Sequence, residues 1–328
     1  MDCPTAERAQ RAVLVLVLLL GLVSAGSAAW FYFAPSSLLK LVLRPPRLGK
    51  FELAGSAASG TVIDLQGGWF NEGQPTEIVI RSVRKGESWD VPERITLRNG
   101  RLRGSIRIFG LGRNGEAPRV RESSVSEGHT ERAQAAAPRE IVLENLQVEA
   151  DHRIPLYLGP GVTSVTVKDC TFTGWSISAV AYLDAESADN TIANCTFDCR
   201  AAREVIAVDG SAGNTLSGNR FSRASFGGIY LYRNCGEGGT VRHQTPRENS
   251  IENNTFDLSA LRPGSYGIWL GSRQGRRTYC EADAGYPFGS SIDNHDFADD
   301  NVLIGNVFKP SSLRATRNDG EGNVIALP

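Results

Sequence analysis

The strongest constraint on this chain is a segment of eight residues that recurs through its C-terminal half. Its third residue is always aliphatic and its last residue is always phenylalanine. The copies are VTVKDCTF from Val165, NTIANCTF from Asn190, NTLSGNRF from Asn214, NSIENNTF from Asn249 and NVLIGNVF from Asn301. Their starts lie 25, 24, 35 and 52 residues apart, so a unit of roughly two dozen residues recurs and is lengthened by insertions. Such a period predicts stacked structural units.

Each repeat position has a structural role. The aliphatic third residue points inward, and the phenylalanines close the segment as an aromatic ladder. The ladder consists of Phe172, Phe197, Phe221, Phe256 and Phe308. Asn219, Asn254 and Asn306 mark the bend between two strands, where asparagine tolerates a positive φ and can hydrogen-bond its copy one coil away. Parallel strands about 4.8 Å apart then satisfy their backbone groups between coils.

This pattern resembles the repeat of the pectate-lyase-like superfamily, which includes pectate lyases, polygalacturonases, and alginate lyases and epimerases. The resemblance covers roughly residues 60–328. It implies an all-β fold, a right-handed single-stranded parallel β-helix, and carbohydrate chemistry outside the cytoplasm. The Asp-Pro-His-Asp tetrad of alginate epimerases is absent, and so is the Gly-His-Gly triplet of polygalacturonases. The reaction type therefore stays open.

The N-terminal part predicts a membrane anchor. Residues 1–11 form a short tail, and residues 12–34 carry no charge and are long enough to cross a bilayer as one helix. A cleaved secretory signal is the alternative, because basic residues precede the apolar run and small residues follow its core. Residues 35–59 are predicted to be a linker, ahead of a β-helix domain over 60–328.

The location of that domain follows from the resemblance. More basic residues follow the apolar segment than precede it, and this excess of positive charge argues for a cytoplasmic domain. We nevertheless predict an extracytoplasmic domain, periplasmic or at the cell surface, anchored by one N-terminal helix. The 35 Lys and Arg nearly cancel the 36 Asp and Glu, so no global field would collect nucleic acid. The predicted partners are a polysaccharide and the membrane.

A second strand follows each repeat segment. Its inward ladder consists of Leu158, Leu183, Val208, Leu231 and Leu270. Alternation along a strand sends the neighbouring residues outward. One outward column holds Tyr157, Tyr182, Ala207, Tyr230 and Trp269, and the next holds Gly159, Asp184, Asp209, Tyr232 and Gly271. Aromatic rings along an outer face suit the apolar faces of sugars in an extended polysaccharide. Alternatively, loops cover the rings as a second apolar cluster.

Three long insertions leave the solenoid directly after this second strand, at residues 111–139, 233–248 and 272–300. Because they share an edge, they should wall one side of the aromatic face. The first is rich in Arg, Glu and Ser and is predicted to be a mobile polar loop. Cys235 and Cys280 fall in the other two, which predicts a disulfide in an oxidising compartment, with two unpaired thiols as the alternative.

Asp184 and Asp209 occupy the same outward position on adjacent coils, so one of their pKa values should rise. The pair fits a glycosidase acid and base, a Ca²⁺ site, or proton abstraction from C5 of a uronic acid. Alternatively, both aspartates only shape turns. Tyr232 and Arg233 stand beside them as catalytic candidates, and Arg273 could bind substrate carboxylates.

We therefore predict a membrane-tethered, carbohydrate-active protein that acts on or binds an extended, acidic polysaccharide as a lyase, hydrolase or epimerase. The predicted catalytic residues are Asp184, Asp209, Tyr232 and Arg233. The predicted substrate-binding residues are Tyr157, Tyr182, Tyr230, Trp269 and Arg273. Beyond the Ca²⁺ alternative no cofactor is predicted. A non-catalytic glycan-binding or envelope scaffold module is the alternative function.

Overall fold

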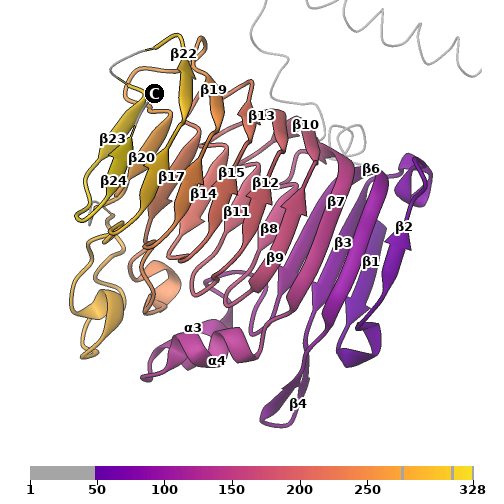
Figure 1. Cartoon of the computed structure of the whole chain (residues 1–328). Coiled ribbons are helices and arrows are strands. Elements are labelled where there is room, and N and C mark those ends of the chain that lie inside the picture. The colour runs from indigo at the N-terminus through magenta and orange to yellow at the C-terminus, as the bar shows by residue number, and fades with distance from the viewer. Residues whose placement is uncertain (1–48, 275–276, 312–313, 327–328) are drawn as a thin grey trace, which may run out of the picture. The chain divides into compact units, whose positions relative to one another are not determined.

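The computed structural model of the chain describes residues 49–274, 277–311 and 314–326. Over these residues successive strands lie parallel to partners one coil away, as in a parallel β-helix (Figure 1). The predicted tail at 1–11 and the predicted membrane or signal segment at 12–34 lie outside the described residues. Within the described ranges, no helix is long and apolar enough to cross a membrane.

The strands of the described part stack into three rows, which form the faces of the coil. The first row holds β2 (Val62–Asp64), the start of β6 (Glu93–Phe109), the start of β7 (Arg139–Asp151), β9 (Thr163–Lys168), β12 (Thr191–Ala193), β15 (Thr215–Ser217), β18 (Ser250–Glu252), β21 (Val302–Ile304) and β24 (Val324–Ala326). The second holds the middle of β6, the end of β7, β10 (Thr171–Ser176), β13 (Thr196–Ala201), β16 (Arg220–Phe221), β19 (Thr255–Asp257) and β22 (Val307–Lys309). The third holds β1 (Gly49–Ala54), β3 (Thr76–Arg81), the end of β6, β8 (Leu156–Leu158), β11 (Ala181–Leu183), β14 (Ile206–Asp209), β17 (Ile229–Tyr232), β20 (Ile268–Leu270) and β23 (Thr316–Asn318).

The repeat register is confirmed coil by coil. Ile192 pairs with Val167 on one side and Leu216 on the other, and all are fully buried. The ring of Phe197 stacks between those of its neighbours in the ladder, with centroids 5.1 Å and 5.0 Å away. Inward positions spaced one coil apart thus form one continuous apolar core. Strands also begin earlier in the chain than the repeat pattern indicates. β1, which lies inside the range 35–59 predicted to be a linker, already pairs with β3.

The corner between the first and second rows differs from the prediction in one detail. The positive φ falls on the residue before the ladder asparagine, for example at Asn253 (54°) and Gly305 (67°). The ladder asparagine itself is buried and bonds its copies: the Asn254 side chain donates to Asn306 Oδ1 at 2.9 Å and accepts from the Asn219 backbone N–H at 2.9 Å. The turn residue is exposed to solvent at Asn253, so the two jobs are divided between neighbours.

A second asparagine ladder, which the sequence analysis does not assign, runs through the first position of the repeat. Asn214 donates from its side chain to Asn249 Oδ1 at 2.7 Å and accepts from the Asn190 side chain at 3.1 Å. Asn249 continues the chain by donating to Asn301 Oδ1 at 2.9 Å. Each buried amide therefore satisfies its neighbour, which removes the cost of burying it.

The insertions leave the coils at the same edge, at the bottom of Figure 1. The first contains α3 (Pro118–Ser124) and α4 (His129–Ala135), so the predicted mobile polar loop is wrong. A small apolar cluster holds the two helices, and it consists of Leu111, Val120, Ala133 and Ala136. The polar composition of the segment does not indicate this cluster. The remaining elements are the hairpin β4 (Val83–Lys85) and β5 (Ser88–Asp90) and the short 3₁₀ helices Ser56–Ala58, Phe70–Gly73, Glu237–Gly239 and Gly289–Ser291.

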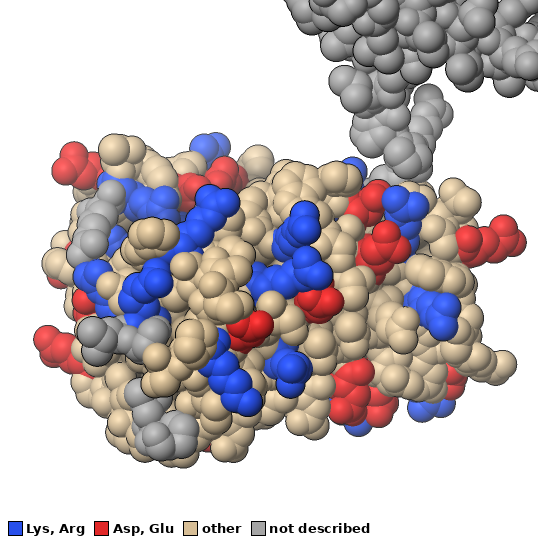
Figure 2. All heavy atoms as spheres, turned by 90° about the horizontal axis from the view of Figure 1, so that it is seen from above, with Lys and Arg blue, Asp and Glu red and all other residues tan. Residues whose placement is uncertain are grey.

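The opposite edge, seen from above in Figure 2, carries acidic and basic side chains interspersed, with several basic ones close together near its middle. Turns that join the second row to the third contribute Arg153, Arg223 and Arg262, all exposed. The Arg223 Nε donates to Asp198 at 2.6 Å, so part of this positive charge is neutralised locally.

Candidate functional site

The outward aromatic column forms in the predicted register. Tyr182 pairs with Tyr157 and with Ala207, and Tyr230 pairs with Ala207 and with Trp269. The rings of Tyr157 and Tyr182 stack with centroids 5.1 Å apart. Each ring lies on the outer side of the coil, opposite the inward leucines of β8 and β11.

The expectation that these rings lie open along a groove is wrong for the tyrosines. Tyr157, Tyr182 and Tyr230 are only 7–8% exposed, whereas Trp269 is half-buried. The rings form a second apolar cluster with Ala207, against which Ile154, Tyr266 and Trp269 pack. An extended polysaccharide therefore cannot lie on this column as the sequence analysis proposed.

Where the insertions meet the third row they leave a polar pocket of about 290 Å³. Its lining comprises Asn114, Gly115, Glu116, Tyr157, Tyr182, Asp184, Arg203, Asp209, Asn234, Glu237, Arg242, Arg273, Arg277 and Tyr279. Exposed residues such as Asn114 and Glu116 form the rim, and fully buried ones such as Asp209 and Arg242 form the floor. Register thus brings five predicted site residues to one pocket: Tyr157, Tyr182, Asp184, Asp209 and Arg273.

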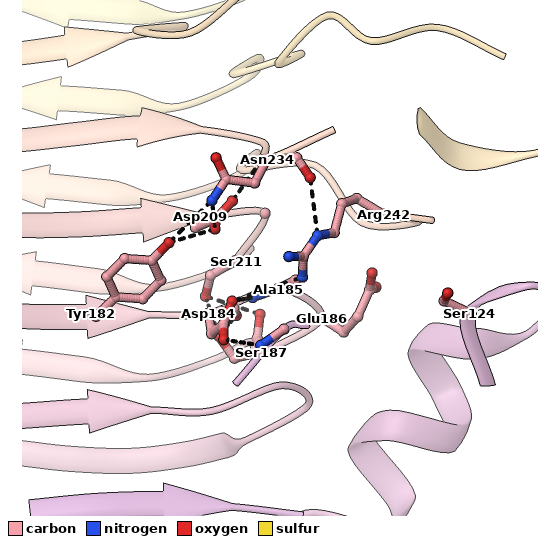
Figure 3. A network of polar contacts seen from close by, with 12 residues as sticks. Ser124, Tyr182, Asp184, Ala185, Glu186, Ser187, Asp209, Ser211, Asn234 and Arg242 are labelled. Carbon is pink, nitrogen blue, oxygen red and sulfur yellow. Dashed lines mark hydrogen bonds and ion pairs between the residues drawn. The ribbon is translucent and has the colours of Figure 1, made fainter. Parts of the chain in front are cut away.

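Asp184 follows β11 and is 2% exposed. Its carboxylate accepts hydrogen bonds from the Tyr157 hydroxyl at 2.5 Å, the Gly115 backbone N–H at 2.7 Å and the Ala185 backbone N–H at 2.9 Å. The Arg242 guanidinium stands 3.9 Å away (Figure 3). Burial raises the pKa of Asp184, Arg242 opposes that shift, and the nearby charge of Asp209 adds to it. Asp184 is therefore suited to carry a proton.

Asp209 ends β14, one coil further along the solenoid. Its carboxylate accepts hydrogen bonds from the Tyr182 hydroxyl at 2.7 Å, and from the Asn234 side chain at 2.7 Å and backbone N–H at 2.8 Å. These donors stabilise a carboxylate. Burial, followed by the charges of the aspartates, raises the pKa of Tyr157 and Tyr182 well above the ordinary value, so both stay protonated. The same tyrosine–aspartate pair thus occurs on adjacent coils.

Arg242 crosses the pocket floor from the second insertion. Its Nε donates to the Asn234 carbonyl at 3.0 Å, while its Nη1 is buried without a hydrogen-bond partner. Burial lowers the pKa of Arg242, but Asp209 and Asp184 raise it more, so the guanidinium stays charged. Gly115 packs closely against the Arg242 guanidinium, because a Cβ atom at Gly115 would lie 2.2 Å from Arg242 Nη1.

The model of the right-handed β-helix region, a protein family, matches residues 135–308, which is more than half of the chain. The chain belongs to the right-handed β-helix family. No curated protein matches this β-helix chain in sequence.

Among solved structures, the mannuronan C-5 epimerase A-module of Azotobacter vinelandii is similar, with 12% identity, a TM-score of 0.25, and coverage of 86% of this chain and 90% of that one. The GH136 lacto-N-biosidase of Eubacterium ramulus is similar, with 10% identity and a TM-score of 0.17. That similarity covers 84% of this chain and 62% of the lacto-N-biosidase chain. Both likenesses are too weak to carry an argument about activity.

Four predicted site residues of the β-helix lie outside the pocket lining. Tyr230 accepts from the Tyr266 backbone N–H at 2.9 Å, and Trp269 donates to Asp319 at 2.9 Å. Both hold neighbouring turns instead of facing the pocket. Their coils lie beyond the one that contributes Asp209, where the outer face is filled by packing.

The prediction of Arg233 as a catalytic group is not supported by its contacts. Its guanidinium donates to the backbone carbonyl of His295 at 2.7 Å and to that of Asp293, and its backbone N–H donates to Asp296 at 3.0 Å. Arg233 therefore anchors the third insertion. Its side chain leaves the strand in the opposite direction from Tyr232 because directions alternate along an extended chain.

Tyr232 is fully buried behind the pocket wall. Its hydroxyl donates to Glu204 at 3.0 Å and accepts from Arg203 at 3.0 Å, and the Arg273 guanidinium lies 3.5 Å from its ring centre. Arg273 in turn donates to the Asn234 side chain. Tyr232 is thus a support for two pocket arginines.

Cys235 and Cys280 form a disulfide, as predicted. The bond joins the second insertion to the third, across a sequence separation of 45. Because Asn234 precedes Cys235, the link fixes the segment that carries the main partner of Asp209. Cys170, Cys195 and Cys199 are buried free thiols.

Six residues of the pocket lining were not predicted from the sequence: Arg242, Asn234, Arg203, Arg277, Tyr279 and Glu237. Arg203 and Asn234 flank third-row strands and could have been noticed by position. The rest lie deep in insertions with no repeat to align them. Across residues 49–274, 277–311 and 314–326, no cluster of three His, Cys, Asp or Glu side chains could hold a metal ion. The aspartates already accept bonds from N–H and O–H donors, which favours proton chemistry over a Ca²⁺ site.

Proposed function

We propose that this β-helix protein is a carbohydrate-active enzyme that performs acid/base chemistry on an acidic glycan in the pocket, using Asp184 and Asp209. The observation that carries the proposal is the pair of buried carboxyls on adjacent coils, each bonded to a tyrosine hydroxyl. Two carboxyls in different environments are how one site supplies both an acid and a base.

The roles follow from the surroundings. Asp184, whose pKa is raised by burial, delivers a proton to the leaving oxygen or to a carbanion. Asp209, which accepts hydrogen bonds from Tyr182 and Asn234, acts as base or nucleophile. This division of labour serves a hydrolase, a lyase and a C5 epimerase, and the product identifies which.

The acidic nature of the glycan is supported by the lining. Arg203, Arg242, Arg273 and Arg277 line a small pocket, and guanidinium groups bind carboxylates in bidentate fashion. Tyr279 at the pocket wall adds an aromatic surface for a sugar ring.

We further propose that the domain works outside the cytoplasm, held by residues 12–34. The Cys235–Cys280 disulfide supports this location, because such bonds persist in oxidising compartments. Alkylation of thiols in intact cells, before and after reduction, tests it: labelling of Cys235 without reductant would contradict the proposal.

The catalytic assignment is tested with Asp184→Asn and Asp209→Asn on a panel of uronate polymers. We expect turnover to fall by about 10²–10⁴-fold in each, the usual loss for a general acid or base. Asp198→Asn is the matched control, because Asp198 lies on β13 and pairs with Arg223 away from the pocket. Turnover that survives both pocket substitutions would refute the assignment, and binding without turnover in the wild type would favour the non-catalytic glycan-binding module.

A further inference from the structure

We infer that the pocket receives one acidic sugar residue at the end of a chain, and that Arg242 holds the carboxylate of that residue. This inference rests on the proposed function and narrows its substrate from an extended polymer stretch to a chain terminus.

The first argument is the closure of the outer face. A polymer lying along the solenoid axis would need the outward side chains of β8, β11, β14 and β17 to be exposed. Tyr182 and Tyr230, which lie on either side of Ala207, are both 8% exposed, and Tyr157 on the coil before is 7% exposed. Backbone and side-chain groups of the insertions contact both aspartates directly, through Gly115 and Asn234. From Tyr157 to Tyr230 the column is therefore covered, and the pocket opens that cover beside Tyr157 and Tyr182.

The second argument is size. The pocket volume of about 290 Å³ lies at the lower limit of the ~300–1,000 Å³ typical of small-molecule sites. That volume suits a single sugar ring with its substituents. Its lining passes from exposed Asn114 and Glu116 to buried Asp209 and Arg242, so a chain enters by its tip from the side of the first insertion.

The third argument is a guanidinium nitrogen at the pocket floor that makes no hydrogen bond. Arg242 is 2% exposed, and its Nη1 lies 3.9 Å from the Asp184 carboxylate, too far for a hydrogen bond, although a buried donor without one is costly. Figure 3 shows its guanidinium between the Asp184 and Asp209 groups, on the side where the insertions close. A ligand carboxylate would satisfy that donor and place the sugar ring against both aspartates.

The fourth argument is the charge of the lining. Four arginines face four carboxyl groups: Glu116, Asp184, Asp209 and Glu237. Burial raises the pKa of Glu237 as well as that of Asp184, so both bind protons more readily than ordinary carboxyls. Arginine keeps its charge at all working pH values. The four guanidinium groups of the lining can each donate two parallel hydrogen bonds to a carboxylate, which favours an anionic sugar over a neutral one.

The test is calorimetric titration of the full chain carrying Asp184→Asn, which prevents turnover. The probes are D-galacturonate, D-glucuronate and D-mannuronate, with D-galactose, D-glucose and D-mannose as neutral counterparts. We expect at least one uronate to bind, and its neutral counterpart to bind at least ~10-fold more weakly, the factor that about 1.4 kcal/mol of lost interaction produces.

Two further variants locate the carboxylate. Arg242→Lys keeps a charge but removes the guanidinium, and Gly115→Ala places a methyl group against Nη1 while leaving Arg242 in the chain. Both should weaken uronate binding at least ~10-fold. Arg121→Lys is the matched control, because Arg121 lies in the same cover and donates to Gly238 outside the pocket. Circular dichroism verifies that each variant is folded.

The outcomes separate the two proposals. Binding of tetramers or longer oligouronates without binding of any monosaccharide would overturn the inference, and so would uronate binding that is unchanged in both Arg242→Lys and Gly115→Ala. With wild-type protein, mono- or disaccharide products from the first time points, or proton exchange confined to the terminal sugar, support the end pocket. Internal cleavage or exchange refutes the end pocket and leaves the proposed function standing. Monosaccharide binding with no turnover of any polymer refutes the proposed function alone.

Discussion

The corner between the first and second rows and the outer face of the third row use the same repeat in opposite ways. At the corner, identical residues stack on their copies: Phe197 lies between two phenylalanines, and Asn254 bonds two asparagines. On the outer face of the third row the run of identical residues is short: Tyr157 stacks on Tyr182, but Asp209 already has Tyr232 as its partner on the next coil. Long ladders hold the coils together, whereas the short run of paired residues forms a local site.

The largest effect should follow from interrupting a ladder of identical residues. Phe197→Ala removes a buried ring that stacks on both neighbours, and we expect the free energy of unfolding to fall by about 3–5 kcal/mol. Urea denaturation followed by circular dichroism measures it. Phe197→Leu, which keeps most of the apolar volume, should cost clearly less; an equal loss in both variants would show that buried apolar volume does not account for the effect.

The next effect concerns the insertions and not the coils. Replacing Cys235 and Cys280 together by serine opens a loop with a sequence separation of 45, and we expect a loss of about 2–4 kcal/mol from the greater entropy of the unfolded chain. Hydrogen exchange should locate the loosening in residues 233–248 and 272–300. A reductant should reproduce the loss of stability in the wild type and leave the double variant unchanged. Hydrogen exchange that rises equally in the coils would contradict an effect confined to the insertions.

A single asparagine should matter less than a ring. Asn254→Ala leaves the Asn219 backbone N–H and the Leu216 carbonyl without their partner, and we expect a total loss of about 1–3 kcal/mol. Thermal unfolding measures the loss. Asn253→Gly is the control at the adjacent exposed turn, where the φ of 54° suits glycine, and it should change stability little. A larger loss in the control would reverse the division of roles between the two residues.

The smallest effect is the pH dependence of stability at the pocket. Because folding raises the pKa of Asp184 above the ordinary 3.8, the folded state binds more protons between the two values, and stability falls as pH rises through that window. Each unit by which the pKa is raised contributes about 1.4 kcal/mol. Asp184→Asn should remove this slope, and Asp198→Asn should keep it. Urea titrations from acid to neutral pH give the comparison, and identical slopes in Asp184→Asn and the wild type would be incompatible with a buried, proton-binding Asp184.

The fold could be predicted from the sequence because its determinants recur. Phe172 and Phe197 occupy the same place in two copies, so the spacing alone aligns them. The same logic brought Asp184 and Asp209 together before their partners were known. The positive φ at Asn253 was missed because Asn254, beside it, is also an asparagine and only backbone geometry separates the two.

The rest of the site depends on tertiary contacts that have no period. Arg242 reaches the aspartates only because the second insertion folds back over the third row, and no second copy of that segment exists to align. Burial of Tyr157 and Tyr182 depends on the same cover. The composition of the first insertion indicated a polar loop, but the apolar side of α3 and α4, with Val120 and Ala133, decides its structure.

The place of the pocket along the stack has a consequence for how the protein resists partial unfolding. Its aspartates follow β11 and β14, with β8 and β6 before them and β17, β20 and β23 after them. In a solenoid each coil is held by its nearest neighbours, so opening starts at the termini and travels inward. The coils that carry the pocket would be the last to fray, and heating should melt the outermost turns while the pocket still holds its shape.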